Sequence, residues 1–79
     1  MQTMTQTSLK SWRESLDPRV TQEDIARKAD VRLYTYQKAE NGKRISFTTA
    51  RAIHSAVNEI CRERKLPEKD IFDLGLNIV

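Results

Sequence analysis

The sequence has little of the chemistry that enzymes and metal proteins use. One cysteine, Cys61, excludes an internal disulfide, and one histidine, His54, offers no cluster of metal ligands. No nucleophile, base and orienting residue accompany His54, so we expect neither an enzyme nor a bound metal or cofactor. No apolar run approaches the length of a membrane span. The first seven residues lack the apolar segment of a signal peptide, which together with the free thiol predicts a cytoplasmic protein.

Charge is unevenly distributed along the chain. The net charge of +3 is modest for 79 residues, but residues 19–51 carry +4, residues 1–18 balance to zero and residues 52–79 carry −1. A basic segment of this kind is typical of proteins that bind a polyanion. The distribution therefore favours nucleic acid as a partner of the central segment.

Helical apolar spacing predicts an all-α protein with a single domain over residues 8–79, after a flexible N-terminal arm at residues 1–7. The chain is too short for more than one compact core, and no alternating strand pattern is present. We expect five helices, each bounded by capping and stop signals. They run from Ser8 to the stop at Asp17-Pro18, from the cap Thr21 to a turn at Asp30, from about Leu33 to Glu40, from Thr48 or Thr49 to near Lys65, and from Pro67 to Gly75.

Two residues are expected to turn the chain sharply with a left-handed backbone conformation. Asp30 follows the second helix, and aspartate tolerates a positive φ better than most residues. Gly42 closes the third helix as a left-handed cap. The predicted core contains Leu9, Trp12, Leu16, Ile25, Val31, Tyr36, Ile53, Val57, Ile60, Ile71 and Phe72.

The segment spanning residues 21–43 carries the most specific motif of the chain. Its parts are Thr21-Gln22-Glu23, Ile25-Ala26, the corner Ala29–Val31, and Glu40-Asn41-Gly42-Lys43. With these residues the chain resembles the lambda-repressor-like (Cro and XRE type) family of helix-turn-helix DNA-binding proteins. The resemblance implies a five-helix domain in which helices 2 and 3 form the helix-turn-helix and helix 3 reads the major groove of double-stranded DNA. It also implies a sequence-specific transcriptional regulator, of the repressor kind, associated with a bacterial or phage nucleoid.

Three positions depart from the pattern of that family. Asp30 stands where the turn usually has glycine, Arg32 replaces a small cap residue, and Tyr36 fills a core position that is usually aliphatic. Asp30 is expected to cost some stability without changing the geometry. The Tyr36 hydroxyl must find a hydrogen-bond partner or reach the surface.

Four residues of the third helix are predicted to face outward and to read bases. Helical periodicity and the family's reading positions both indicate this face. Gln37 can hydrogen-bond a purine edge, preferably adenine, and Lys38 can donate to guanine. Leu33 and Tyr34 could pack against thymine methyl groups. The alternative is an ordinary solvated helix face, on which two exposed apolar residues are harder to explain.

A second set of residues is predicted to contact the DNA backbone, which supplies affinity more than sequence choice. The resemblance assigns Gln22 to a phosphate at the start of the second helix. The other backbone-contact residues flank the third helix or lie at its start: Arg32, Thr35, Asn41, Lys43 and Arg44. For Lys43 and Arg44 the alternative of solvated loop charges has equal standing.

The resemblance also pairs Arg13 with Glu40 in a semi-buried salt bridge that ties helix 1 to the end of helix 3. Such a pair would fix the angle of the reading helix, whereas the alternative is two independent surface charges. The two cases differ in energy, because breaking a buried pair costs about 3–5 kcal/mol and an exposed pair is worth under about 1 kcal/mol.

One reading helix covers too few base pairs for useful selectivity, so we expect a homodimer with two reading helices about 34 Å apart. The dimer candidates lie in a fifth helix and apolar tail at residues 66–79: Ile71, Phe72, Leu76, Ile78 and Val79. The competing expectation is that this tail folds back over its own core. An alternative function also stays open, namely an antitoxin or accessory module that mainly binds another protein through Leu33 and Tyr34.

Overall fold

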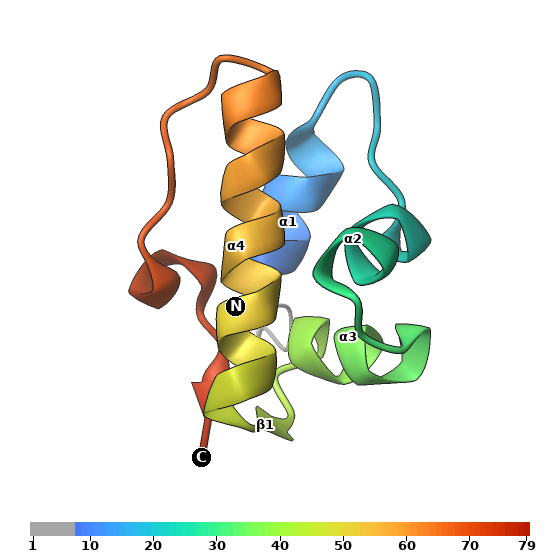
Figure 1. Cartoon of the computed structure of the whole chain (residues 1–79), viewed down its shortest axis with the longest axis vertical. Coiled ribbons are helices and arrows are strands. Elements are labelled where there is room, and N and C mark those ends of the chain that lie inside the picture. The colour runs from blue at the N-terminus through green and yellow to red at the C-terminus, as the bar shows by residue number, and fades with distance from the viewer. Residues whose placement is uncertain (1–7) are drawn as a thin grey trace, which may run out of the picture.

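Four α-helices make up most of the chain in the computed structural model, which describes residues 8–79 (Figure 1). The protein is thus mostly helical, as the predicted all-α class requires. The N-terminal arm expected at residues 1–7 lies outside the described residues. The elements are α1 (Ser8–Ser15), α2 (Gln22–Ala29), α3 (Leu33–Glu40), β1 (Arg44–Ile45), α4 (Phe47–Glu63), the 3-10 helix η1 (Ile71–Leu74) and β2 (Asn77–Ile78).

Helix α4 stands at the centre of the molecule, with α2 and α3 to one side and the segment after α4 returning along the other (Figure 1). Helix α2 packs against both α4 and α3, while η1 packs against α1 and α4. Trp12, Leu16 and Val31, predicted to be core residues, are only partly buried and lie at the margin of the core. The buried core consists of Leu9, Val20, Ile25, Ala26, Ala29, Tyr36, Ala39, Ile45, Ala50, Ile53, Ala56, Val57, Ile60, Cys61 and Leu74. Among residues 8–79, no helix combines the length and the apolar character that crossing a membrane requires.

Local sequence signals account for the connection between α2 and α3. Thr21 caps α2, because its hydroxyl accepts from the Asp24 amide at 3.0 Å and the Asp24 carboxylate accepts from the Thr21 amide at 3.1 Å. Asp30 ends α2 with a φ of 59°, which confirms the predicted left-handed turn. Arg32 precedes α3 without a side-chain cap. After α3, Gly42 has a φ of 78°, also as predicted.

Helix α4 begins earlier and ends earlier than predicted. Its N-cap is Ser46, whose hydroxyl accepts a hydrogen bond from the Thr49 amide at 3.1 Å. The sequence interpretation favoured Thr48 or Thr49 for this role, although serine caps helices at least as well as threonine. The helix ends at Glu63, and the backbone turns at Lys65 with a φ of 59°.

The length predicted for the fifth helix, from Pro67 to Gly75, is wrong. In this segment only the four residues of η1 are helical. Three residues per turn place positions three apart on the same side of such a helix. Leu74 is therefore buried and Ile71 half-buried, whereas Phe72 is 83% exposed. The assignment of Phe72 to the core is wrong for this reason.

The C-terminal tail folds back onto its own chain. Strand β2 pairs in parallel with β1, with Arg44 opposite Asn77 and Ile45 opposite Ile78. The Val79 amide extends this pairing by donating to the Ile45 carbonyl at 2.9 Å. Of the two expectations for the tail, folding back is the one that the structure shows. The strands were not predicted, since two residues are too few to display an alternating pattern.

Candidate nucleic-acid interface

Helix α3 lies at the surface near the N-terminal end of α4 (Figure 1), and its outer side chains define the candidate interface. Tyr34 is 71% exposed, and Gln37 and Lys38 are half-buried. The Lys38 Nζ atom lies 5.6 Å from the centroid of the Tyr34 ring, which is a cation–π arrangement. Because positions three and four apart share a helix face, three of the four predicted base-reading residues gather on one side of α3.

Leu33, the fourth predicted base-reading residue, is the first residue of α3 and lies four positions before Gln37. Its side chain is half-buried, packs against the core and lines an open hollow beside Ala26 and Val31. Leu33 is therefore partly covered by its own chain, it is half-buried like Gln37 and Lys38, and its role in reading bases stays a prediction. The apolar face of α2 lies close to the first turn of α3 and partly covers this side chain.

A buried ion pair joins α1 to the end of α3. Arg13 Nε donates to Glu40 Oε2 at 2.6 Å, and Arg13 Nη2 donates to Glu40 Oε1 at 3.2 Å. The Glu40 side chain is 0% exposed and that of Arg13 is 10% exposed. Arg13 Nη1 also donates to the Val20 carbonyl at 3.1 Å. The predicted pair is therefore present and buried, and it joins α1, the segment before α2, and α3.

Tyr36 donates a further hydrogen bond to the same carboxylate. Its hydroxyl lies 2.6 Å from Glu40 Oε2, so the buried hydroxyl has a partner inside the protein. Burial acts to raise the pKa of Glu40, but hydrogen bonds from Arg13, Tyr36 and Gln22 outweigh it and hold that pKa below its usual value. Burial, followed by the hydrogen bond to Glu40, raises the pKa of Tyr36. The cluster is therefore one ionised carboxylate held by donors from three helices.

Gln22 connects this buried cluster to the outer face of α3. Its Nε2 atom donates to Glu40 Oε1 at 2.9 Å, and Gln37 Nε2 donates to Gln22 Oε1 at 3.2 Å. A chain of hydrogen bonds thus runs from Glu40 through Gln22 on α2 to Gln37 on α3. The sequence interpretation assigned Gln22 to a phosphate and Gln37 to a base, but it missed the bond between them. Only the packing of α2 on α3 brings the two amides together.

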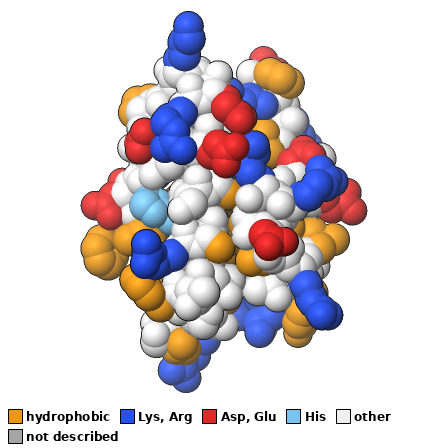
Figure 2. All heavy atoms as spheres, in the orientation of Figure 1, with side chains coloured by type: hydrophobic (Ala, Val, Ile, Leu, Met, Phe, Trp, Pro, Cys, Tyr) orange, Lys and Arg blue, Asp and Glu red, His pale blue; other side chains and the backbone are white. Residues whose placement is uncertain are grey.

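The other residues predicted to contact the DNA backbone surround α3. Thr35 is half-buried, and the exposed members of this set are Arg32, Asn41, Lys43 and Arg44. In Figure 2, Lys and Arg side chains lie over much of the visible face, whereas Asp and Glu side chains are seen only in its upper and middle parts, so the lower end, near α3 and β1, shows basic side chains without acidic ones. The candidate interface is therefore flanked by positive charge.

The loop after α3 is anchored from a distant part of the chain. The Asn77 side-chain amide donates to the Gly42 carbonyl at 3.3 Å, and the pairing of β2 with β1 holds the backbone of Arg44. Lys43 lies between these two attachments. The Lys43 amide also donates to the Lys38 carbonyl at 3.0 Å, so the loop is held both by α3 and by residues 77–79.

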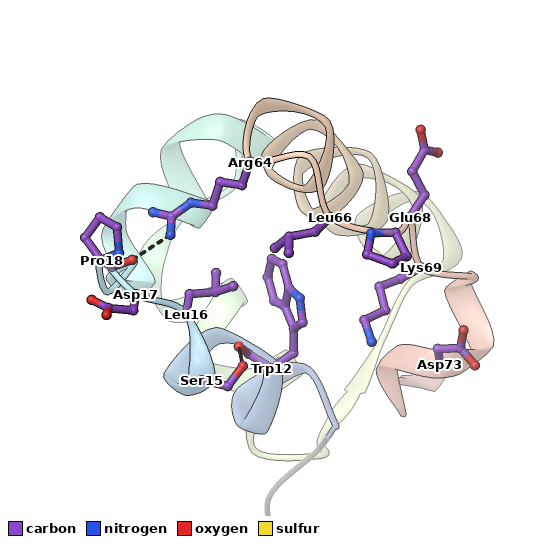
Figure 3. Close-up of a pocket in the computed structure, with 11 residues that line it drawn as sticks. Trp12, Ser15, Leu16, Asp17, Pro18, Arg64, Leu66, Glu68, Lys69 and Asp73 are labelled. Carbon is purple, nitrogen blue, oxygen red and sulfur yellow. Dashed lines mark hydrogen bonds between the residues drawn. The ribbon is translucent and has the colours of Figure 1, made fainter.

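A separate groove of about 820 Å³ lies between the end of α1 and the segment after α4 (Figure 3). Trp12, Leu16 and Leu66 point into it and form apolar walls. Arg64 lies at its side and donates to the Pro18 carbonyl at 2.7 Å. The groove is near the C-terminal end of α4, whereas α3 lies near the N-terminal end, so it is not part of the candidate interface.

The five dimer candidates differ in exposure. Ile71, Leu76 and Ile78 are half-buried and pack against the core of their own chain. Phe72 and Val79 are exposed. Of the five candidates, these two therefore offer the most surface for contact with a second copy.

Within residues 8–79, no three His, Cys, Asp or Glu side chains come close enough together to hold a metal ion. Burial raises the pKa of the Cys61 thiol. His54 Nε2 lies 2.7 Å from the Lys69 carbonyl oxygen, so its ring takes part in holding a loop.

Comparison of the chain with protein families, with curated proteins and with solved structures finds no match. The residues and their geometry are therefore the basis for the function proposed below.

Proposed function

We propose that the protein is a sequence-specific regulator of transcription, of the repressor kind, that binds double-stranded DNA. In this proposal α2 and α3 act as a helix-turn-helix, and α3 enters the major groove. The observation that carries the proposal is the outer face of α3, where Tyr34, Gln37 and Lys38 gather between exposed basic residues.

The chemistry of this face suits a base edge. Gln37 offers amide hydrogen bonds, Lys38 offers a donor for guanine, and the Tyr34 ring can pack against a thymine methyl group. The exposed Arg32, Lys43 and Arg44 would neutralise phosphates beside the groove. Their contribution would be affinity that falls as salt rises, with little dependence on sequence.

The proposed regulator acts as a homodimer, because a single α3 spans too few base pairs for selectivity. Two copies related by a two-fold axis would place their α3 helices about 34 Å apart on one side of the duplex. Of the five predicted dimer candidates, Phe72 and Val79 are the exposed ones and would contribute to the contact between copies.

Selection of bound duplexes from a random pool tests this proposal with the purified protein alone. We expect a palindromic consensus whose half-sites are centred about one turn of DNA apart. A pool with no enriched sequence would contradict sequence-specific binding. An enriched site without two-fold symmetry would contradict the homodimer.

A second candidate function is an antitoxin or accessory module whose main partner is another protein. It is favoured by one observation, the 83% exposed aromatic side chain of Phe72. Binding of the selected DNA by the protein alone would support the regulator. Binding of DNA only in a purified complex with a protein encoded next to it would support the second candidate.

A further inference from the structure

We propose that Glu40 and Tyr36 are positioning residues for base recognition. Acting through Gln22, they fix which end of the Gln37 amide faces the DNA, so that Gln37 selects adenine over guanine. This inference rests on the proposed function and adds to it the physical origin of purine choice at one base pair.

The direction of the hydrogen-bond chain is set at its buried end. An ionised carboxylate can only accept hydrogen bonds. Glu40 Oε2 accepts from the Tyr36 hydroxyl and from Arg13 Nε, both at 2.6 Å, and Oε1 accepts from Arg13 Nη2 at 3.2 Å and from Gln22 Nε2 at 2.9 Å. Gln22 must therefore turn its NH2 group toward Glu40 and its carbonyl oxygen toward Gln37.

The same logic applies to the next amide. Gln37 must turn its NH2 group toward the Gln22 oxygen, which lies 3.2 Å away. One N–H of that group is used in this bond, so the atoms left for DNA are the second N–H and the carbonyl oxygen Oε1. Gln37 therefore presents one donor and one acceptor side by side.

This pair of groups matches adenine and opposes guanine. In the major groove, adenine offers the acceptor N7 and the donor N6, whereas guanine offers two acceptors, N7 and O6. A glutamine free to rotate could turn its NH2 group toward guanine. In this chain that rotation would bring the oxygens of Gln37 and Gln22 face to face, because Gln22 is itself held by Glu40.

Burial of the carboxylate makes the arrangement persistent. The Glu40 side chain is 0% exposed, so water is not available to replace a protein donor. The two bonds to Oε2 hold the carboxylate in one orientation, which is the contribution of Tyr36 and Arg13. The choice of purine at the surface is thus set by a group that never touches DNA.

The test is the ratio of affinities for duplexes with adenine or guanine at one base pair. That base pair is the one at which Gln37→Ala relaxes the preference of the parent protein. We expect the parent to prefer adenine there by roughly tenfold or more, since a bidentate contact discriminates by about 1–3 kcal/mol. In Glu40→Gln, the new amide keeps its oxygen toward the two donors at 2.6 Å, Tyr36 and Arg13 Nε, and turns its NH2 group toward Gln22, with the loss of the 3.2 Å bond from Arg13 Nη2. Both downstream amides then reverse, and the ratio is expected to shift by about tenfold toward guanine.

Gln22→Met provides a second variant that leaves the buried ion pair in place. It removes the link between Glu40 and Gln37, so Gln37 can rotate, and the preference is expected to level without reversing. Lys43→Ala is the matched control, because loss of a phosphate contact weakens binding to both duplexes alike and leaves the ratio unchanged. Circular dichroism melting establishes that each variant is folded at the temperature of the binding assay.

The outcomes separate this inference from the proposed function. If the parent binds its site but Gln22→Met and a folded Glu40→Gln keep the parental ratio, the positioning role is refuted and the function stands. A parent that prefers guanine at the base pair read by Gln37 also refutes it. If the parent binds no DNA, the proposed function fails and this inference fails with it.

Discussion

Two polar clusters hold this small protein together, and they are built on different principles. Around Glu40, side chains from three helices donate to one buried carboxylate. In the second cluster, the side-chain amide of Asn58 on α4 bonds both backbone groups of Lys69. It donates to the Lys69 carbonyl at 3.0 Å and accepts from the Lys69 N–H at 2.7 Å. His54 adds a contact to the same carbonyl at 2.7 Å.

The difference concerns what each cluster orients. The Glu40 cluster carries charge and sets the relation between whole helices, so the loss of Arg13 or of Glu40 leaves the other buried without its counter-ion. The Asn58 cluster is neutral. Its amide bonds the backbone N–H and carbonyl of Lys69, which lies in the irregular segment between α4 and η1. The Glu40 cluster is therefore expected to contribute more to the free energy of unfolding and to fix the position of α3. The Asn58 cluster is expected to fix the conformation of one loop.

The largest expected effect comes from breaking the charged cluster. Arg13→Ala is expected to lower the free energy of unfolding by about 3–5 kcal/mol, because Glu40 is left buried without its counter-ion. Thermal melting and urea denaturation measure this loss. The matched control is Arg27→Ala, at an exposed ion pair with Asp24 at 3.6 Å, where the loss should stay under about 1 kcal/mol. Equal losses in the two variants would mean that the buried pair contributes no more than a surface pair.

Lowering the pH should affect the two clusters differently, because only the Glu40 cluster contains a carboxylate. The pKa of Glu40 is held below its usual 4.5, so the unfolded chain takes up this proton first as the pH falls. The stabilisation is therefore present above about pH 4.5 and is lost as the pH falls through the lower pKa of the folded state. Denaturation midpoints measured through this range should fall more steeply for the parent than for Glu40→Gln.

The control for the acid experiment is Asn58→Ala, which keeps the Glu40 carboxylate and should keep the parental slope. Asp24, whose pKa is also lowered, chiefly by the backbone hydrogen bond from Thr21, is present in all three proteins. The difference in slope thus isolates Glu40. A Glu40→Gln variant as acid-sensitive as the parent would contradict the assignment.

A smaller effect is expected from breaking the neutral cluster. Asn58→Ala removes both hydrogen bonds to the Lys69 backbone and should lower the free energy of unfolding by about 1–3 kcal/mol. Urea denaturation measures the change, and hydrogen exchange should show faster exchange at the Lys69 amide. Because this cluster is remote from α3, affinity for the selected DNA should stay at the parental value. A loss of DNA affinity at a temperature where the variant is folded would contradict the separation of roles.

The last expected effects concern single proposed contacts to DNA and act on binding, with the smallest change in the free energy of unfolding. Lys38→Ala should relax preference at one base pair by about 1–3 kcal/mol, whereas Lys43→Ala should weaken all duplexes alike and reduce the salt slope by about one unit. Binding titrations at several salt concentrations separate the two patterns. If both variants bind every duplex like the parent, the assignment of contacts on and beside α3 is wrong.

Sequence reasoning was most accurate where a single residue decides local geometry. The cap at Thr21, the left-handed Asp30 and the turn at Gly42 depend on neighbours within one turn, and all three are present in the structure. The burial of Phe72 was predicted wrongly, because it depends on whether its segment winds as an α-helix or as a 3-10 helix. That outcome is decided by packing against other elements.

The candidate site shows the same division. Tyr34, Gln37 and Lys38 could be placed on one face from helical periodicity, since the spacing of a helix is constant. Leu33 also packs against the core, a contact that helical periodicity alone does not give. The bond between Gln22 and Gln37 could not be found in this way, because it depends on how closely two helices approach.

The attachment of the loop after α3 to Asn77 and Val79 has a consequence for dissection of the molecule. A peptide cut to residues 21–43 would carry Gln22, Tyr34, Gln37, Lys38 and Lys43, yet it would lack Arg13 at one end and the tail at the other. Such a fragment would keep the side chains proposed to contact DNA but would lose the contacts that hold α3 and the following loop in position. A graft of α2 and α3 onto another scaffold therefore also needs replacements for the contacts made by Arg13 and by the C-terminal tail.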